Sequence, residues 1–191
     1  MHVTLRSACR SLRTQFVFPT LRRAIAAANR ADPTRFLVAH YSVQGDHIHL
    51  VVEASARVAL IEGVRGLSIR IARHVNKLLS RKGRFFADRW HGRALSSPRA
   101  VRNVLVYVLG NFRKHQVQTK AILDVYSSAP YFTGFIEFPR GAPIQESGCS
   151  FPAALAPPEE CAVVPARSWL LSIGWKRHGA LSLSECPASS P

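Results

Sequence analysis

The sequence predicts an α+β fold: an antiparallel sheet with helices on one face, then an additional C-terminal helix and a poorly structured tail. Three observations predict it: short runs that alternate apolar and polar residues, longer runs with helical periodicity between them, and a Pro-, Ala- and Ser-rich stretch late in the chain. With 191 residues, 47% of them hydrophobic, the chain can form one ordinary core and an extension. We expect a domain at residues 1–120 and a linker and tail at residues 121–191.

The first half of the chain contains three strands and a helix. HVTLR, at residues 2–6, alternates like a short strand, and residues 18–33 form an Ala-rich helix that ends at a proline, which cannot continue it. RFLVAHYSV and HIHLVVEA follow as two strands. The Gly-Asp pair between them favours a hairpin.

The next part repeats the pattern. Residues 57–83 have helical periodicity and end at Gly83, residues 84–95 read as a fourth strand, and Ser97-Pro98 opens a helix that runs to residue 116. The first six elements match the ferredoxin-like split βαβ arrangement, in which helices cover one face of the sheet. The other face is then open for a ligand.

Charge indicates the partner. Lys and Arg total 26 against 11 Asp and Glu, which gives a formal net charge of +15. Residues 1–120 contain 22 of the basic and 5 of the acidic side chains, whereas residues 121–191 contain 4 and 6. We therefore expect the first 120 residues to bind a polyanion, with nucleic acid as the partner.

Cysteine spacing and hydropathy exclude other classes. The cysteines at positions 9, 149, 161 and 186 form no C-x-x-C pair, so neither a zinc ribbon nor a dithiol redox motif is indicated. No stretch reaches the ~20 apolar residues of a membrane span. We expect a cytoplasmic protein without a membrane partner.

Two histidines lie one residue apart in YSVQGDHIHLVVEA. Alternate side chains of a strand share a face, so His47 and His49 point one way while Ile48 and Leu50 point to the core. Two neutral imidazoles can bind a metal ion. A His-x-His pair alone is more often a surface or hydrogen-bonded pair, so the assignment needs a second observation.

The last predicted helix supplies that observation. At about 100° per residue, Val101, Leu105 and Phe112 lie on its apolar stripe, whereas Tyr107 and Asn111 lie on the polar stripe opposite. A tyrosine in a helix normally packs in the core, and this one is placed away from it. Because Asn111 follows Tyr107 by one turn, a phenol and an amide project from one face.

These motifs resemble those of the HUH single-strand nucleases. GDHIHLVVEA is similar to the His-hydrophobic-His motif of that superfamily, and YVLGN to the Tyr-x-x-x-Asn helix of its single-tyrosine transposase branch. With FADRWHGRALSSPRAVRNVLVYVLGNFRKH, the chain resembles the bacterial REP-associated tyrosine transposases over residues 2–116, and WLLSIGWKRHG in the tail is similar as well. One departure is Phe112, because many relatives have proline after the asparagine.

The resemblance implies an activity and a site. His47, His49 and Asn111 match the metal ligands, and Tyr107 matches a nucleophile that attacks single-stranded DNA near a hairpin. The implied products are a 5′-phosphotyrosine and a free 3′-hydroxyl, which can reverse the reaction and join a new end. The implied partner is single-stranded or hairpin DNA, bound by a monomer or homodimer that is nucleoid-associated in the bacterial cytoplasm.

Elementary chemistry agrees with this assignment. A divalent ion offsets the charge of a phosphodiester, and imidazoles with one amide oxygen suit Mn²⁺ or Mg²⁺. A phenol has a pKa of about 10, so it needs a base or cation to attack at neutral pH. His40 and His91 are candidate bases. A covalent phosphotyrosine conserves the phosphodiester energy, so no nucleotide cofactor is needed.

Basic and aromatic side chains are the candidate DNA contacts. On the helix at residues 57–83 the cations lie opposite the apolar stripe without interleaved acidic residues, although a solvated helix face explains them equally well. Trp90, Phe85 and Phe86 are candidates for base stacking, with core packing the alternative for at least one phenylalanine. The predicted nucleic-acid-binding residues are Arg70, Arg73, Lys77, Arg89, Arg93, Arg99, Arg102, Arg113 and Lys114.

Two other functions stay open at this point. A non-catalytic basic ferredoxin-like module would bind DNA or RNA without cutting it, and it needs no phenol on the polar stripe. A metal-dependent hydrolase that activates water needs an acidic ligand, for which only Asp46 and Glu53 qualify.

Overall fold

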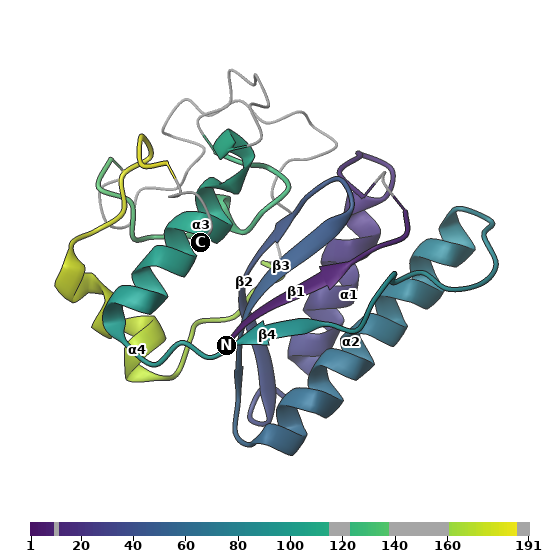
Figure 1. Ribbon diagram of the computed structural model, residues 1–191, viewed down its shortest axis with the longest axis horizontal. Helices are drawn as coiled ribbons and strands as arrows, with labels where there is room; N and C mark the ends of the chain where they lie inside the picture. Colours follow the sequence, from purple (N-terminus) through teal and green to yellow (C-terminus); the bar gives the residue numbers. More distant parts are fainter. Residues whose placement is uncertain (10–11, 115–122, 138–160, 187–191) are drawn as a thin grey trace.

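The computed structural model describes residues 1–9, 12–114, 123–137 and 161–186. They form a four-stranded antiparallel sheet with the order β2-β3-β1-β4 (Figure 1). The elements are β1 (His2–Arg6), α1 (Phe18–Ala31), β2 (Phe36–Val43), β3 (His47–Ala54), α2 (Arg57–Leu78), β4 (His91–Arg93), α3 (Pro98–Lys114) and α4 (Trp169–Ser172). This order confirms the predicted split βαβ arrangement. No helix among the described residues is long and apolar enough to cross a membrane.

One face of the sheet carries α1 and α2. Val3, Leu50 and Val52 point to this face and pack with the apolar sides of both helices in one buried cluster. Close approach of α2 to β2 requires a glycine, because a Cβ at Gly63 would lie 2.2 Å from Cγ of Phe36.

The opposite face carries α3, which contacts β2 and β3. Leu37 and Val51 from the sheet pack with Leu105 from α3 in a second buried cluster. In Figure 1, α3 lies on the side of β2 and β3, and β4 lies away from it at the other edge of the sheet. The three residues of β4 are exposed. Helices α1 and α2 thus share one face as predicted, and α3 is the additional helix.

Strand β2 contains a bulge. Its register with β3 shifts between Val38 and His40, so that Ala39 is an extra residue. Before the bulge Val38 packs on the α1 and α2 side, and after it Tyr41 does. Ala39 belongs to the α3 side.

The fourth strand is much shorter than predicted. Regular pairing is limited to His91–Arg93, and the preceding residues are joined to β1 by a single bridge between Ser7 and Phe86. Phe85 is buried in the core, which fixes the backbone there by side-chain packing rather than by a ladder. The preceding helix ends at Leu78, and Ser80 with φ 50° and Gly83 with φ 88° turn the chain towards β4.

The described parts of residues 121–191 pack against the sheet and α3. Phe132, Phe135, Leu171 and Trp175 join the cluster on the α3 side, and Asp124 forms a bidentate ion pair with Arg13 at 2.7 and 2.9 Å. The aromatic residues explain this order within a stretch that we expected to be a linker and tail. Residues 138–160 of the expected linker lie outside the described residues.

Candidate active site

The strand register places the histidine pair. His49 lies opposite Thr4 of β1 and Ser42 of β2, and its neighbours Ile48 and Leu50 are fully buried on the α1 and α2 side. His47 and His49 therefore point to the α3 side, as the strand period predicts. Their ring centroids are 4.7 Å apart.

Helix α3 brings Tyr107 to this pair. The phenol oxygen lies 3.3 Å from Nε2 of His49, and the two rings meet edge to face with centroids 5.0 Å apart. Because α3 packs across β3, the polar stripe that carries Tyr107 meets the histidines directly. His47, His49 and Tyr107 thus form one cluster, although Tyr107 follows His49 by 58 positions in the sequence.

Asn111 is completely buried, and neither atom of its amide has a hydrogen-bond partner among the residues that the structure describes. An unpaired buried polar group costs about 1–3 kcal/mol, so such groups are rare in native proteins. Asn111 follows Tyr107 by one helical turn. Its unpaired amide is explained if the native site contains a ligand that binds it.

The Nδ1 atoms of both histidines have partners. Nδ1 of His47 lies 2.7 Å from Oδ1 of Asp46, and this contact lowers the pKa of the Asp46 carboxyl. Nδ1 of His49 lies 3.2 Å from Nε2 of His2 and 3.2 Å from the hydroxyl of Thr4. Contacts at Nδ1 are typical of histidines that bind metals through Nε2, because they fix the ring orientation.

Sequence reasoning did not identify His2 and Thr4 as members of this site. Both alternate on β1, and the same face of β1 meets His49 once the register between β1 and β3 is known. Burial, and then the positive charges of the N-terminus and Arg93, lower the pKa of His2 to about 4. His2 is therefore a neutral imidazole at pH 7.

The two candidate bases lie in different surroundings. His40 packs edge to face on Phe132 and lies 3.5 Å from the hydroxyl of Ser128, and burial lowers its pKa to about 4. His91 is exposed on β4. His49 is the imidazole that contacts the phenol of Tyr107.

The carboxylates proposed for a water-activating hydrolase have other contacts. Glu53 accepts hydrogen bonds from the backbone amides of Arg167 at 2.7 Å and Ser168 at 3.0 Å, at the beginning of α4. Asp46 contacts His47. In the described part of the chain, no group of three or more His, Cys, Asp or Glu side chains is arranged to hold a metal ion.

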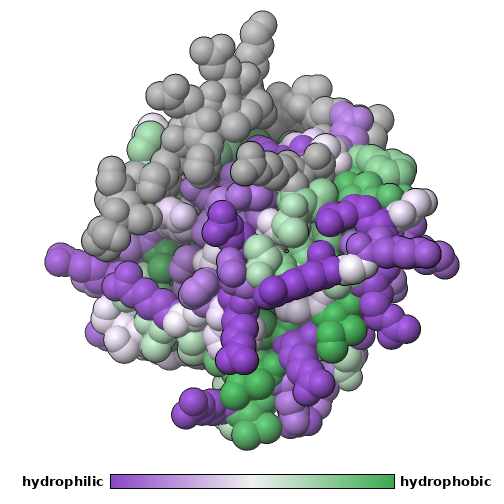
Figure 2. Space-filling model, turned by 45° about the vertical axis from the view of Figure 1, so that its right-hand side comes forward, coloured by the Kyte–Doolittle hydropathy of each residue, from purple (hydrophilic) through white to green (hydrophobic). Residues whose placement is uncertain are grey.

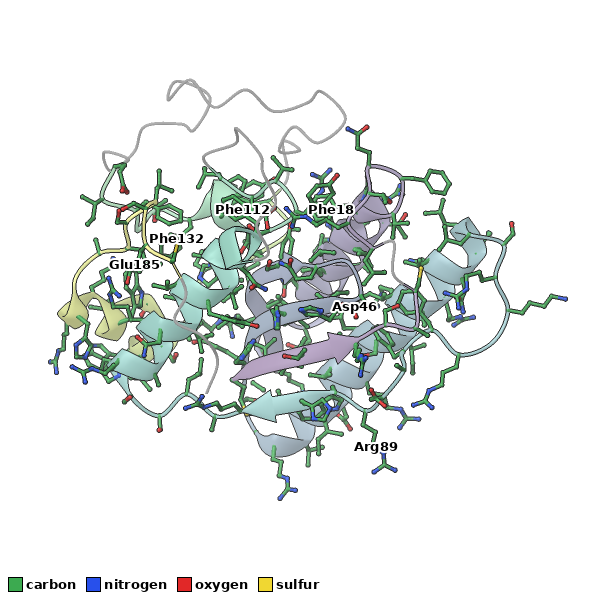
Figure 3. All side chains as sticks on the ribbon, turned by 45° about the horizontal axis from the view of Figure 1, so that its top comes forward. Phe18, Asp46, Arg89, Phe112, Phe132 and Glu185 are labelled. Atoms are coloured by element: carbon green, nitrogen blue, oxygen red, sulfur yellow. The ribbon has the colours of Figure 1, made fainter. Side chains whose placement is uncertain are left out.

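The predicted DNA-binding cations separate into groups. Arg89, Arg93 and Arg99 are exposed on and around β4 and at the beginning of α3, and Figure 3 labels Arg89 near this edge of the sheet. Arg70, Arg73 and Lys77 belong to α2, in the layer on the opposite face. The side chains of Arg113 and Lys114 lie outside the described residues.

Arg102 has a different environment from the one predicted. Its guanidinium donates to both carboxylate oxygens of Glu185, at 2.6 and 2.9 Å, and to the backbone oxygens of Gly179 and Ala180. Figure 3 shows Glu185 beside α3. Arg102 therefore fastens the C-terminal segment to α3, which makes it a structural residue rather than a phosphate contact.

The aromatic candidates also differ from one another. Phe85 is buried in the core, as the alternative for this pair predicted, and it packs edge to face on Phe86. Trp90 is half-buried and lines a cavity of about 700 Å³ beside β4, with Leu95 and Leu170. Gly92 leaves room for this indole, because a Cβ there would lie 2.5 Å from it.

Comparison with known proteins supports the fold. The structure is similar to that of a REP-associated tyrosine transposase bound to a REP hairpin, with a TM-score of 0.51 and 18% sequence identity over 66% of this chain and 74% of the other. No family model matches the sequence, and no curated protein matches it. The resemblance inferred from the motifs is thus confirmed at the level of the fold.

Proposed function

We propose that the chain is a metal-dependent endonuclease and strand transferase that acts on single-stranded DNA near hairpins through a 5′-phosphotyrosine. The main support is the position of the Tyr107 phenol, 3.3 Å from His49 and one helical turn from the buried amide of Asn111. A protein that only binds nucleic acid has no need of this cluster. The similar structure is a transposase in complex with hairpin DNA, which agrees with the proposal.

The residues present fit a divalent metal. His47, His49 and Asn111 would hold Mg²⁺ or Mn²⁺, and such an ion would offset the negative charge of the phosphodiester. The unpaired amide of Asn111 supports this assignment, since a ligand would satisfy it. The contacts of Asp46 and Thr4 at the Nδ1 atoms orient the two imidazoles.

Tyr107 would supply the nucleophile. Its oxygen forms a bond to phosphorus while the bond between phosphorus and the 3′-oxygen breaks, which leaves a 5′-phosphotyrosine and a 3′-hydroxyl. The phenol loses one proton and the 3′-oxygen gains one, so the step consumes no net proton. The phenol oxygen lies beside Nε2 of His49, the atom through which this residue would hold the metal, so the nucleophile would be close to a phosphate bound there.

The DNA would approach over the β1 and β4 half of the α3 face. His91 and Arg93 are exposed there, and Arg6 forms only a long ion pair with Asp88, 3.9 Å between the closest atoms. Exposed ion pairs are weak, so phosphates can compete for such an arginine. Cations on this part of the α3 face would bind the phosphates of the DNA strand.

The test is covalent capture. The protein is incubated with labelled single-stranded oligonucleotides that contain imperfect hairpins, with Mn²⁺ or EDTA, and denaturing gels are scored for an adduct. We expect a metal-dependent adduct that is absent in Tyr107→Phe and present in Tyr126→Phe, a matched loss of a phenol outside the site. An adduct that persists in Tyr107→Phe contradicts the proposal. Tight, salt-sensitive binding with no adduct favours the non-catalytic binding module.

A further inference from the structure

The end of α2 carries cations that the proposed active site does not use. Between residues 63 and 87 the sequence contains seven Lys and Arg residues and no Asp or Glu. Five of them form the patch that we call the cationic end of α2: Arg70, Arg73, Lys77, Lys82 and Arg84. Arg70 is half-buried and the other four are exposed, whereas Arg81, between them, has a fully buried guanidinium nitrogen.

The cationic end of α2 is not balanced within the protein. Among the residues that the structure describes, none of its five cations has a carboxylate within ion-pair distance. The negative end of the α2 dipole accounts for a charge or two near Lys77, not for five. Such a concentration of like charge indicates a polyanionic partner.

The patch lies on the opposite side of the sheet from Tyr107, since α2 and α3 cover different faces. A phosphate bound there cannot be the one that Tyr107 attacks. The loop that follows α2 connects the two regions: the backbone amide of Ala87 donates to the oxygen of Arg6, and the chain continues through Arg89 to Arg93 on edge strand β4. Cations thus continue from α2 around the edge of the sheet towards the site.

Composition indicates which form of nucleic acid binds. Residues 57–84 contain no Phe, Tyr or Trp, so α2 offers no ring on which an unpaired base could stack. Binding there depends on phosphates alone, and duplex DNA presents one negative charge per ~1.7 Å of its axis. A helical stem therefore suits this patch better than a single strand does.

We infer that the cationic end of α2 binds the duplex stem of the hairpin, and that the adjoining single strand crosses the β4 edge at Arg89 and Arg93 to reach Tyr107. This inference rests on the proposed function for its choice of DNA. On this inference the stem binds on one face of the sheet, and the single strand is cut on the opposite face.

A membrane surface is the competing partner, because exposed Val58, Ile61 and Ile69 also lie on α2. Val58 and Ile61 lie near the beginning of the helix, and Ile69 directly precedes Arg70. From Arg70 to Arg84 the described residues include no exposed large hydrophobic side chain. Figure 2, which brings this side forward, shows long hydrophilic side chains projecting from the surface with hydrophobic patches among them. The surface from Arg70 to Arg84 is thus charged without exposed apolar side chains, which favours a polyanion over a lipid bilayer.

The experiment compares two oligonucleotides in EDTA, where no chemistry is needed. One contains a hairpin stem with a single-stranded extension, and the other is the extension alone. Affinities are measured by fluorescence anisotropy at several salt concentrations for wild type, Arg73→Gln/Lys77→Gln, and the control Arg65→Gln, which removes one charge elsewhere on α2. Thermal unfolding checks that each variant is folded.

We expect the double variant to lose about tenfold more affinity for the stem-containing DNA than for the extension alone. The slope of log affinity against log salt concentration should become shallower by about 2, because two phosphate contacts are lost. Arg65→Gln should leave this ratio unchanged. Equal losses on both oligonucleotides, or no loss, would overturn the inference. The inference would also be overturned if the double variant lost binding to phosphatidylserine vesicles while its affinity for DNA stayed unchanged. Because the assay does not depend on an adduct, its failure is distinguishable from failure of the proposed reaction.

Discussion

The two faces of the sheet differ in what their side chains do. On the α1 and α2 side, β1 and β3 present Val3, Leu5, Ile48, Leu50 and Val52, all of them buried in an apolar cluster. On the α3 side the same two strands present His2, Thr4, His47 and His49 in a chain of polar contacts. From His47 to Leu50, β3 thus contributes alternately to the candidate site and to the core, whereas Val51, next on the α3 side, packs in the second buried cluster.

Stability and chemistry can therefore be perturbed separately in this protein. Adjacent residues of β3 point to opposite faces, so neighbouring substitutions should have opposite phenotypes.

The largest expected effect comes from the pair Leu50 and His49. Leu50→Ala should lower the free energy of unfolding by about 2–5 kcal/mol, because Leu50 is fully buried under the helices. His49→Ala should abolish the DNA adduct and cost less, about 1–2 kcal/mol, because His49 is buried but its ring contacts are polar. Urea unfolding and the adduct assay measure the two effects. Equal destabilisation by both variants would contradict the claim that the two faces of β3 differ in their contribution to stability.

The α3 side should also make the fold sensitive to acid. Burial lowers the pKa of His40 from its ordinary value of 6.5 to about 4, so the unfolded chain binds more protons between these values. Stability should therefore fall as the pH drops from 6.5 towards 4, by up to ~3 kcal/mol from this residue. Urea unfolding of His40→Gln should show a smaller loss over this range. His74→Gln, which changes an exposed histidine of α2, should behave like wild type.

Asn111 permits a test in which a site residue opposes stability. Asn111→Leu should raise the free energy of unfolding in EDTA by about 1 kcal/mol, since it removes an unpaired buried amide and keeps the side-chain volume. Mn²⁺ should raise the Tm of the wild type and leave that of the variant unchanged. A variant that is less stable than wild type, with an intact metal response, would show that the amide has a structural partner.

The smallest effect concerns the C-terminal segment. Arg102→Gln removes the bidentate contact with Glu185 and should cost about 1 kcal/mol, because this ion pair is only partly buried. Hydrogen exchange should become faster at residues 179–186 while β3 stays protected. Unchanged exchange in this segment would mean that its apolar contacts alone hold it on α3.

Period and spacing were sufficient to predict the central cluster. A two-residue period placed His47 and His49 on one face, and a 3.6-residue period placed Tyr107 with Asn111, before any contact between strand and helix was known. What these periods cannot provide is pairing between distant segments. His2 and Thr4 enter the site through the register of β1 with β3, and Arg102 meets a partner 83 residues later.

Burial was the other quantity that the pattern could not supply. Asn111 lies on the polar stripe of α3, yet it is fully buried because the packing of α3 on the sheet encloses that stripe. In the same way, the aromatic residues after residue 120 are too sparse to give a period, although they complete the second core cluster. Both outcomes depend on how elements pack, which a single segment does not encode.

The bulge in β2 makes the length of that strand as important as its composition. Because Ala39 is an extra residue, Phe36 and Val38 before it and Tyr41 and Val43 after it all reach the same core. If Ala39 paired regularly, without the bulge, strict alternation would turn one of these pairs out of the core, whereas deleting Ala39 would leave all four residues on the core side. Over evolutionary time this position should accept small replacements and also the loss of its single codon.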